Sequence, residues 1–202
     1  MIVKICGITR LEDALAAAEE GAAAVGFIFV RTSPRRIEAA AAAEIIEKLP
    51  PFLCPVGVFV NERREDVMAT IERTGIRCLQ FHGEEPPADT AGFPVPVIKS
   101  FHVRDDFEPS MIASYPLPAY LLDTYAPGMH GGTGKTFDWR KAQVASRYGR
   151  IILSGGITPE NAALAVRTVR PYALDVSSGV ESSPGVKDRR KIRELFENLR
   201  IA

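Results

Sequence analysis

Short apolar runs alternate with segments of helical period from one end of the chain to the other, and this alternation limits the possible folds more than any other feature. Eight apolar runs can be counted in 202 residues. Most are unbroken by polar residues, which is typical of parallel strands covered on both faces. The predicted strands are Val3–Cys6, Ala24–Phe29, Pro55–Val60, Cys78–Phe81, Val95–Phe101, Ala119–Asp123, Arg150–Ser154 and Ala173–Val176.

Six of the intervening segments have the period of an amphipathic helix. Thr158-Pro159-Glu160 and Asn61 are typical of helix starts, because both place a capping residue ahead of a helical segment. The segments Glu84–Gly92 and Arg104–Tyr115 contain prolines and are the weakest helix candidates, with a single turn as the alternative for each. The predicted helices are Leu11–Glu20, Ala39–Leu49, Arg63–Thr74, Trp139–Tyr148, Pro159–Val169 and Asp188–Leu199.

Eight such units without an evident linker predict an α/β fold, a single-domain (β/α)8 TIM barrel over residues 1–202. A doubly wound dinucleotide fold is disfavoured, since no Gly-x-Gly-x-x-Gly follows the first strand. Because 202 residues is short for a barrel, which usually needs about 250, the loops must be short.

The charge balance excludes several kinds of partner. Lys plus Arg and Asp plus Glu each number 25, so no basic field for nucleic acid or an anionic membrane is expected. The three cysteines lack metal-site spacing and suit a reducing cytoplasm. The first residues resemble no secretory leader, and no apolar run reaches the length of a membrane span. We therefore expect a cytoplasmic protein with a small-molecule partner, and no bound metal.

Two glycine-containing turns follow the last two predicted strands. They are Leu153-Ser154-Gly155-Gly156 and Asp175-Val176-Ser177-Ser178-Gly179. Backbone N–H groups at a helix start bind phosphate well, and glycine lets the backbone approach closely. In (β/α)8 barrels this site usually lies after strands 7 and 8, so the turns predict a phosphate site at the carboxyl-terminal face.

Catalytic groups of such barrels lie at the carboxyl ends of the strands, where this sequence has few polar residues. A thiol and a carboxylate at opposite rims can divide the work of moving one proton on and off a substrate. From local sequence alone, Asp123 is equally well explained as a turn or cap residue. For Lys99, at the end of an apolar run, the alternative to a functional role is a side chain whose ammonium extends to solvent. The candidates are Cys6, Arg35, Arg36, Asn61, His82, Lys99, Asp123 and Asp175.

Eight sequence blocks, in order, carry a more specific signal. They are Lys4–Thr9, Ser33–Arg35, Gly57–Asn61, Gln80–Gly83, Leu122–Thr124, Gly131–Trp139, Ser154–Gly156 and Asp175–Glu181. Together they resemble the phosphoribosylanthranilate isomerase family of tryptophan biosynthesis. The resemblance covers nearly the whole chain, and the family's short barrel agrees with its length.

The resemblance implies an Amadori rearrangement that needs no cofactor. N-(5-phosphoribosyl)anthranilate becomes 1-(2-carboxyphenylamino)-1-deoxyribulose 5-phosphate. By similarity, Asp123 is the general acid that opens the ribose ring, and Cys6 is the general base at carbon 2. Both groups need displaced pKa values, a carboxyl raised by an apolar site and a thiol able to supply thiolate.

The resemblance also implies how the substrate is bound. Arg35 pairs with the anthranilate carboxylate, with Arg36 as the competing candidate. Asp175 lies beside the ribose, and His82 lies near the substrate without an assigned role. The loop Gly131–Lys135 is expected to close as a lid, and the protein to be a monomer or a homodimer. The phosphate is expected to contact Gly155, Gly156, Ser177, Ser178 and Gly179.

Three alternatives stay open on the sequence. A pentose-phosphate epimerase usually needs several metal-binding residues at strand ends, and only His82 is well placed. The isomerase of histidine biosynthesis pairs two aspartates, whereas this chain presents a cysteine and an aspartate. A non-catalytic phosphate-binding barrel has no use for an acid–base pair.

Overall fold

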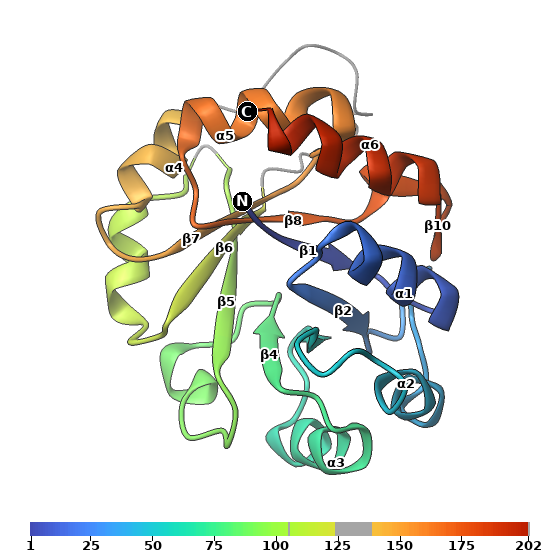
Figure 1. Ribbon diagram of the computed structural model, residues 1–202. Coiled ribbons are helices and arrows are strands. Elements are labelled where there is room, and N and C mark those ends of the chain that lie inside the picture. Colours follow the sequence, from blue (N-terminus) through green and yellow to red (C-terminus); the bar gives the residue numbers. More distant parts are fainter. Residues whose placement is uncertain (105, 124–138, 202) are drawn as a thin grey trace.

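The computed structural model describes residues 1–104, 106–123 and 139–201. Its eight main strands are all parallel and form a closed barrel in the order of the sequence, as predicted. Figure 1 shows the helices arranged outside this barrel. The strands are β1 (Ile2–Cys6), β2 (Ala24–Ile28), β3 (Cys54–Phe59), β4 (Cys78–Phe81), β5 (Val97–His102), β6 (Ala119–Asp123), β7 (Ile151–Ser154) and β8 (Ala173–Val176).

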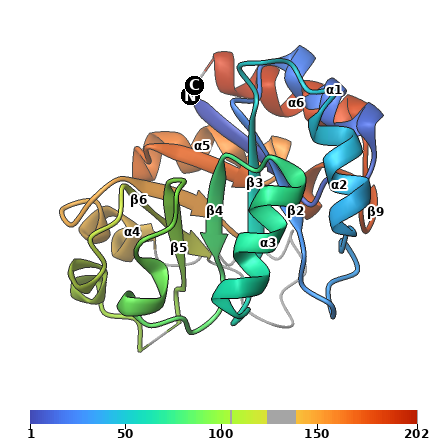
Figure 2. The same ribbon diagram turned by 90° about the horizontal axis from the view of Figure 1, so that it is seen from below.

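Helices follow most strands, and α2 and α3 lie side by side outside β2 to β4 (Figure 2). The two proline-containing segments form short 3-10 helices, η1 (Pro87–Thr90) and η2 (Pro109–Ser114), and no α-helix. Within the described chain, no helix is both long and apolar enough to cross a membrane. The helices are α1 (Leu11–Glu20), α2 (Ala39–Ile46), α3 (Arg64–Thr74), α4 (Trp139–Ala145), α5 (Pro159–Val169) and α6 (Arg189–Arg200).

Two of the predicted helix starts can be compared with the structure. Thr158 precedes α5, and its backbone N–H donates to Asn161 Oδ1 at 2.9 Å. The prediction for Asn61 is wrong, because Arg63 precedes α3 and no side chain caps that end. Asn61 instead has a φ of 48°, and its Oδ1 accepts from Glu84 N at 2.8 Å. Its side chain therefore fixes the loop after β4.

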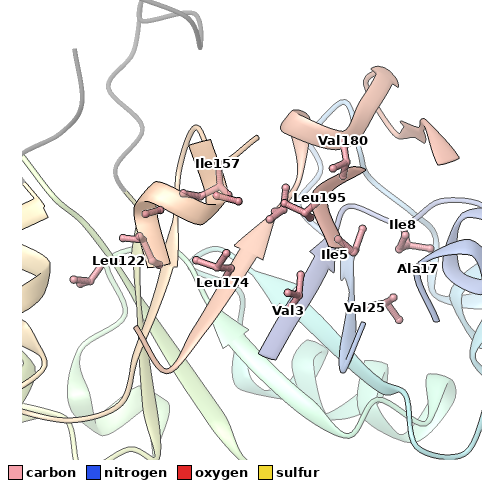
Figure 3. Close-up of a cluster of buried hydrophobic side chains, with 14 of the residues drawn as sticks. Val3, Ile5, Ile8, Ala17, Val25, Leu122, Ile157, Leu174, Val180 and Leu195 are labelled. Carbon is pink, nitrogen blue, oxygen red and sulfur yellow. The ribbon is translucent and has the colours of Figure 1, made fainter. Parts of the chain in front are cut away.

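Strand alternation divides the side chains of the barrel into two sets. One set packs outward against the helices, and Figure 3 shows Leu122 of β6, Leu174 of β8 and Leu195 of α6 in this buried cluster. The other set points into the barrel, where Leu121 and Ile152 belong to a small apolar cluster. Polar residues of this inward set lie nearer the carboxyl ends of the strands. The fold thus directs them toward one common face.

Two boundaries depart from prediction in ways that affect the site. The fifth strand was expected at Val95–Phe101 but runs from Val97 to His102. Pro96 has no N–H to donate to the strand ladder, so pairing begins after it. The strand continues one residue further because His102 pairs in register with Asp123.

An unpredicted two-stranded antiparallel hairpin follows β8. It consists of β9 (Glu181–Ser183) and β10 (Val186–Lys187), and it leads into α6. The turn between the strands contains Gly185, whose φ of +81° suits glycine. The hairpin brings Glu181 and Lys187 beside the carboxyl-terminal face of the barrel.

Candidate active site

Cys6 ends β1 inside the barrel, and its side chain is almost fully buried. Gly26 on β2 faces it so closely that an added Cβ would lie 2.7 Å from the sulfur. Ser177 Oγ donates to the Cys6 carbonyl oxygen at 3.1 Å, which joins the strand end to the loop after β8. Burial raises the pKa of the Cys6 thiol, and the nearby Lys4 ammonium offsets this only in part.

A buried ion pair lies directly beneath the thiol. Lys4 Nζ donates to Asp175 Oδ1 at 2.7 Å, and both side chains are 6% exposed. Ser154 Oγ donates to Asp175 Oδ2 at 3.3 Å. Burial disfavours the ammonium, but the Asp175 carboxylate and the Cys6 side chain together outweigh this effect, so the pKa of Lys4 is raised. Asp175, expected beside the ribose, is thus engaged in holding a positive charge near Cys6.

Asp123 ends β6 and is held by histidines from the two preceding strands. Its Oδ2 lies 3.1 Å from His82 Nε2 and 3.9 Å from His102 Nδ1. The other ring nitrogen of His82 is 3.0 Å from Gln80 Nε2. Burial lowers the pKa of His102, and the neighbouring His82 adds to this effect while Asp123 opposes it. Neutral imidazole is therefore the favoured form of His102.

The sequence interpretation missed His102. It counted His82 as the only well-placed histidine, and this is wrong because β5 ends one residue later than predicted. The available signal was the alternation of strand side chains, since His102 shares the face of Ser100. Had the strand been extended by one residue, His102 would have been placed beside Asp123.

Arg35 lies in the loop after β2 and contacts the hairpin after β8. Its Nη2 pairs with Glu181 Oε2 at 2.7 Å, and its Nε lies 2.9 Å from Glu181 Oε1. Lys187 Nζ reaches the same carboxylate at 2.7 Å. Gly7, with a φ of +77°, leaves room for the Arg35 chain, since an added Cβ would lie 2.8 Å from its Cδ. The neighbouring Arg36 is more exposed and pairs with Glu38.

Opposing effects act on this second ion pair. Burial would raise the pKa of Glu181, but hydrogen bonds from Arg35 and Lys187 outweigh it and lower the pKa. Burial lowers the pKa of Lys187, and Glu181 opposes the change. Glu181 lies in the sequence block Asp175–Glu181, but the sequence did not predict its pairing with Arg35. The partner of Arg35 depends on loop geometry that strand periodicity does not describe.

The two glycine turns contact one another. Gly155 and Gly156 have φ values of +83° and +65° after β7. Gly179 lies in the short 3-10 turn η3 (Ser178–Val180) after β8, where an added Cβ would lie 1.9 Å from the Ile157 carbonyl oxygen. Only glycine permits this approach. The two turns predicted to share a phosphate are therefore neighbours at one edge of the site.

Lys99 has a structural role that the sequence did not suggest. The expectation that its ammonium extends to solvent is wrong, because the residue is 2% exposed. Its Nζ donates to Gly83 O at 2.6 Å and pairs with Glu85 Oε2 at 3.1 Å. Glu85 also accepts from the N–H groups of Asn61 and Gly83. This group fixes the loop that follows His82.

Cys54 and Cys78 begin β3 and β4, at the opposite end of the barrel from Cys6. Burial raises the pKa of Cys78 to about 12, which suits an inert packed thiol. The expected lid, Gly131–Lys135, lies outside the described residues.

Comparison with known proteins gives a consistent result. The family model described as N-(5'-phosphoribosyl)anthranilate (PRA) isomerase matches residues 3–198. The N-(5'-phosphoribosyl)anthranilate isomerase of Citrifermentans bemidjiense is 53% identical over 194 residues, covering 96% of this chain and 94% of that protein. The crystal structure of phosphoribosyl anthranilate isomerase from Thermus thermophilus matches with a TM-score of 0.89 and 45% identity, covering 100% and 99% of the two chains.

A further solved structure holds a ligand. It is a phosphoribosyl anthranilate isomerase in complex with reduced 1-(o-carboxyphenylamino)-1-deoxyribulose 5-phosphate. It matches with a TM-score of 0.87 and 39% identity, covering all of both chains.

The fold and the position of the site define the class of the protein, a (β/α)8-barrel enzyme with its chemistry at the carboxyl ends of the strands. Within that class, the chain belongs to the N-(5'-phosphoribosyl)anthranilate isomerase family of tryptophan biosynthesis. The resemblance drawn from the sequence blocks is thereby confirmed. Membership of an enzyme family also removes the support for a non-catalytic barrel.

Proposed function

We propose that this chain converts N-(5-phosphoribosyl)anthranilate to 1-(2-carboxyphenylamino)-1-deoxyribulose 5-phosphate, with Asp123 as general acid and Cys6 as general base. The observation that carries the proposal is the placement of the two groups. Cys6 ends β1 and Asp123 ends β6, so they lie on different sides of one closed ring of strands and face the same end. A substrate between them meets an acid on one side and a base on the other.

The reaction begins with a proton from the Asp123 carboxyl to the ribose ring oxygen. The bond from that oxygen to carbon 1 breaks, and the anthranilate nitrogen supplies the electrons that form a Schiff base. The Cys6 thiolate then removes the proton on carbon 2, which gives an enolamine. Tautomerisation places a proton on carbon 1 and leaves a ketone at carbon 2. Substrate and product have the same atoms and oxidation level, so no redox partner is needed.

Lys4 supports the role of Cys6. Burial favours the neutral thiol, and the Lys4 ammonium is the largest influence that opposes this shift. The pairing of Lys4 with Asp175 keeps that ammonium charged and fixed in place. We infer that Asp175 contributes through Lys4 as well as lying beside the ribose. The thiolate is a minor species at neutral pH, and this fraction of the Cys6 side chain removes the proton on carbon 2 once the ribose ring has opened.

The remaining contacts divide the substrate between two edges of the site. Arg35, held by Glu181, presents its guanidinium to the anthranilate carboxylate. The phosphate lies at the turns containing Gly155, Gly156, Ser177, Ser178 and Gly179. His82 holds Asp123 and borders the substrate. The ligand of the related enzyme is the reduced form of this product and carries the same carboxyphenylamino and phosphate groups on a five-carbon chain, which supports this substrate class.

The test is the decay of anthranilate fluorescence from freshly made substrate in metal-free buffer. We expect rapid decay with the wild type and at least about a hundredfold loss in Cys6→Ala and Asp123→Asn, the lower end of a general acid–base contribution. Cys54→Ser is the matched control, since that thiol starts β3 at the far end of the barrel. Near wild-type rates in either site variant would refute the assigned roles. No decay above the uncatalysed rate in the wild type would refute the activity.

We also expect a cytoplasmic enzyme without a required metal or cofactor, which acts as a monomer or a homodimer. The described part of the chain contains free cysteines only, which suits a reducing compartment.

A further inference from the structure

Two histidines and an aspartate meet at the carboxyl ends of β4, β5 and β6. We propose that His82, His102 and Asp123 bind a divalent transition-metal ion of the zinc type, and that this ion inhibits the isomerisation. One ligand atom from each of the three residues lies within 4.8 Å of the others. Imidazole and carboxylate are ligands that zinc and its neighbours in the first transition row accept.

The geometry needs only a small adjustment to hold such an ion. Metal–ligand bonds of about 2.1 Å in a tetrahedral site place the ligand atoms about 3.4 Å apart. Asp123 Oδ2 is 3.1 Å from His82 Nε2 and 3.9 Å from His102 Nδ1. All three ligand atoms lie within 4.8 Å of one another, so side-chain movements of about an ångström complete the arrangement. The side chains of His82, His102 and Asp123 are 21%, 35% and 17% exposed, so an ion can reach them from solvent.

Gln80 provides a second observation that favours a metal. A histidine that binds metal through one ring nitrogen usually donates the other N–H to an oxygen atom. His82 Nδ1 lies 3.0 Å from the amide group of Gln80, a residue that is 1% exposed. Among the described residues, Gln80 Oε1 is buried and has no hydrogen-bond partner. The two ends of an amide group are assigned from the hydrogen-bond network. Turning this group over exchanges its two ends, so that Oε1 accepts from His82 Nδ1–H, Nε2 of Gln80 takes the buried position of Oε1, and Nε2 of His82 is left to the metal.

The ion would act as an inhibitor and not as a cofactor. A carboxylate that binds a metal ion has given up its proton, so Asp123 can no longer donate one to the ribose ring. The inhibitory effect rests on the proposed role of Asp123 as general acid. The binding of the ion depends only on the positions of the three ligands.

Binding and inhibition are measured separately, on protein treated with a chelator that is then removed. Co²⁺ is titrated first, because its visible absorption reports the number and kind of ligands. We expect one Co²⁺ per wild-type chain, displaced by Zn²⁺. In His102→Ala the affinity should fall at least about tenfold, the lower end of what losing even a hydrogen-bond partner of a metal ligand costs. Cys54→Ser, which removes a partly exposed thiol elsewhere, should bind as the wild type does.

The rate is then followed against Zn²⁺ concentration, with each variant compared with its own metal-free rate. Inhibition of the wild type should follow the binding curve and be reversed by chelator, and in His102→Ala it should shift by the same factor as binding. Equal Co²⁺ affinity in wild type and His102→Ala, or no spectral change in excess Co²⁺, would overturn the site. Bound Zn²⁺ that leaves the rate unchanged or raises it would overturn the inhibition. An inactive metal-free wild type would refute the proposed function, while the Co²⁺ spectrum would still decide the site.

Discussion

Gly26→Ala should disable the enzyme by displacing the Cys6 thiol, the group that we propose as general base. The added methyl group would lie 2.7 Å from Cys6 Sγ, whereas ordinary contacts begin at 3.4 Å. The sulfur must therefore move by at least about 0.7 Å, the difference between the two distances. Rotation of the thiol is not sufficient relief, because the methyl group is also 3.2 Å from the Cys6 Cα. Both the base and its strand have to shift.

A displacement near 1 Å at a reacting group costs about a hundredfold in rate, or about 2.7 kcal/mol. We expect kcat/KM for the fluorescence decay to fall by this factor in Gly26→Ala. Overpacking should also lower the free energy of unfolding by about 1–3 kcal/mol. Gly75→Ala is the matched control. It places a side chain at a left-handed position after α3, far from the site, and should cost about 1 kcal/mol of stability without loss of rate.

A double-mutant cycle separates the clash from a general effect on folding. In a Cys6→Ala background the sulfur is absent, so Gly26→Ala should cost less stability than in the wild type. The reasoning would be refuted by a Gly26→Ala protein with wild-type stability and less than about a threefold loss in kcat/KM. It would also be refuted by an equal loss of stability in the two backgrounds.

Two further predictions concern the buried charges. Burial raises the pKa of Cys6, so the difference in thiolate absorbance between wild type and Cys6→Ala should have its pH midpoint above that of an ordinary thiol. A midpoint at or below about 8.5 would contradict this. Glu181→Gln should lower the free energy of unfolding at pH 7 by about 3–5 kcal/mol, since Lys187 loses a buried partner. Hydrogen bonds from Arg35 and Lys187 lower the pKa of Glu181 against the effect of burial, so its stabilisation is present above its unfolded pKa and is lost as pH falls through the folded pKa. The difference in unfolding free energy between wild type and Glu181→Gln should therefore shrink as pH falls through that range. Glu38→Gln, which breaks an exposed ion pair, should cost no more than about 1 kcal/mol in the same urea titration, and equal losses would count against the buried pair.

The barrel was predictable because its signals are local and repeated. Each strand is a short apolar run, and α5 has the predicted bounds, Pro159–Val169, because a capping residue and a proline mark its start. The predictions were wrong where contacts with residues distant in sequence determine the structure. β5 ends at His102 because Asp123 pairs with it, and no residue near His102 in sequence carries that information. Lys99 is buried because the loop after β4 places Glu85 beside its ammonium, a contact that the sequence around Lys99 does not reveal.

Part of the site can be predicted from the sequence, because the alternation of side chains along a strand determines which of them point into the barrel. Lys4 is two residues before Cys6, so a strand that directs the thiol inward also directs Lys4 inward, where an ammonium needs a counter-charge. The adjacent strand β8 offers Asp175, which pairs in register with Lys4, so this ion pair follows from strand order and parity alone.

The pairing of Arg35 with Glu181 cannot be derived in this way, because both residues lie beyond the ends of the barrel strands. The paths of their segments depend on Gly7 and on an unpredicted hairpin. The positions of the proposed catalytic groups and of the Lys4–Asp175 pair therefore follow from strand periodicity. The residues that we expect to select the substrate are encoded by loop geometry, which has to be observed.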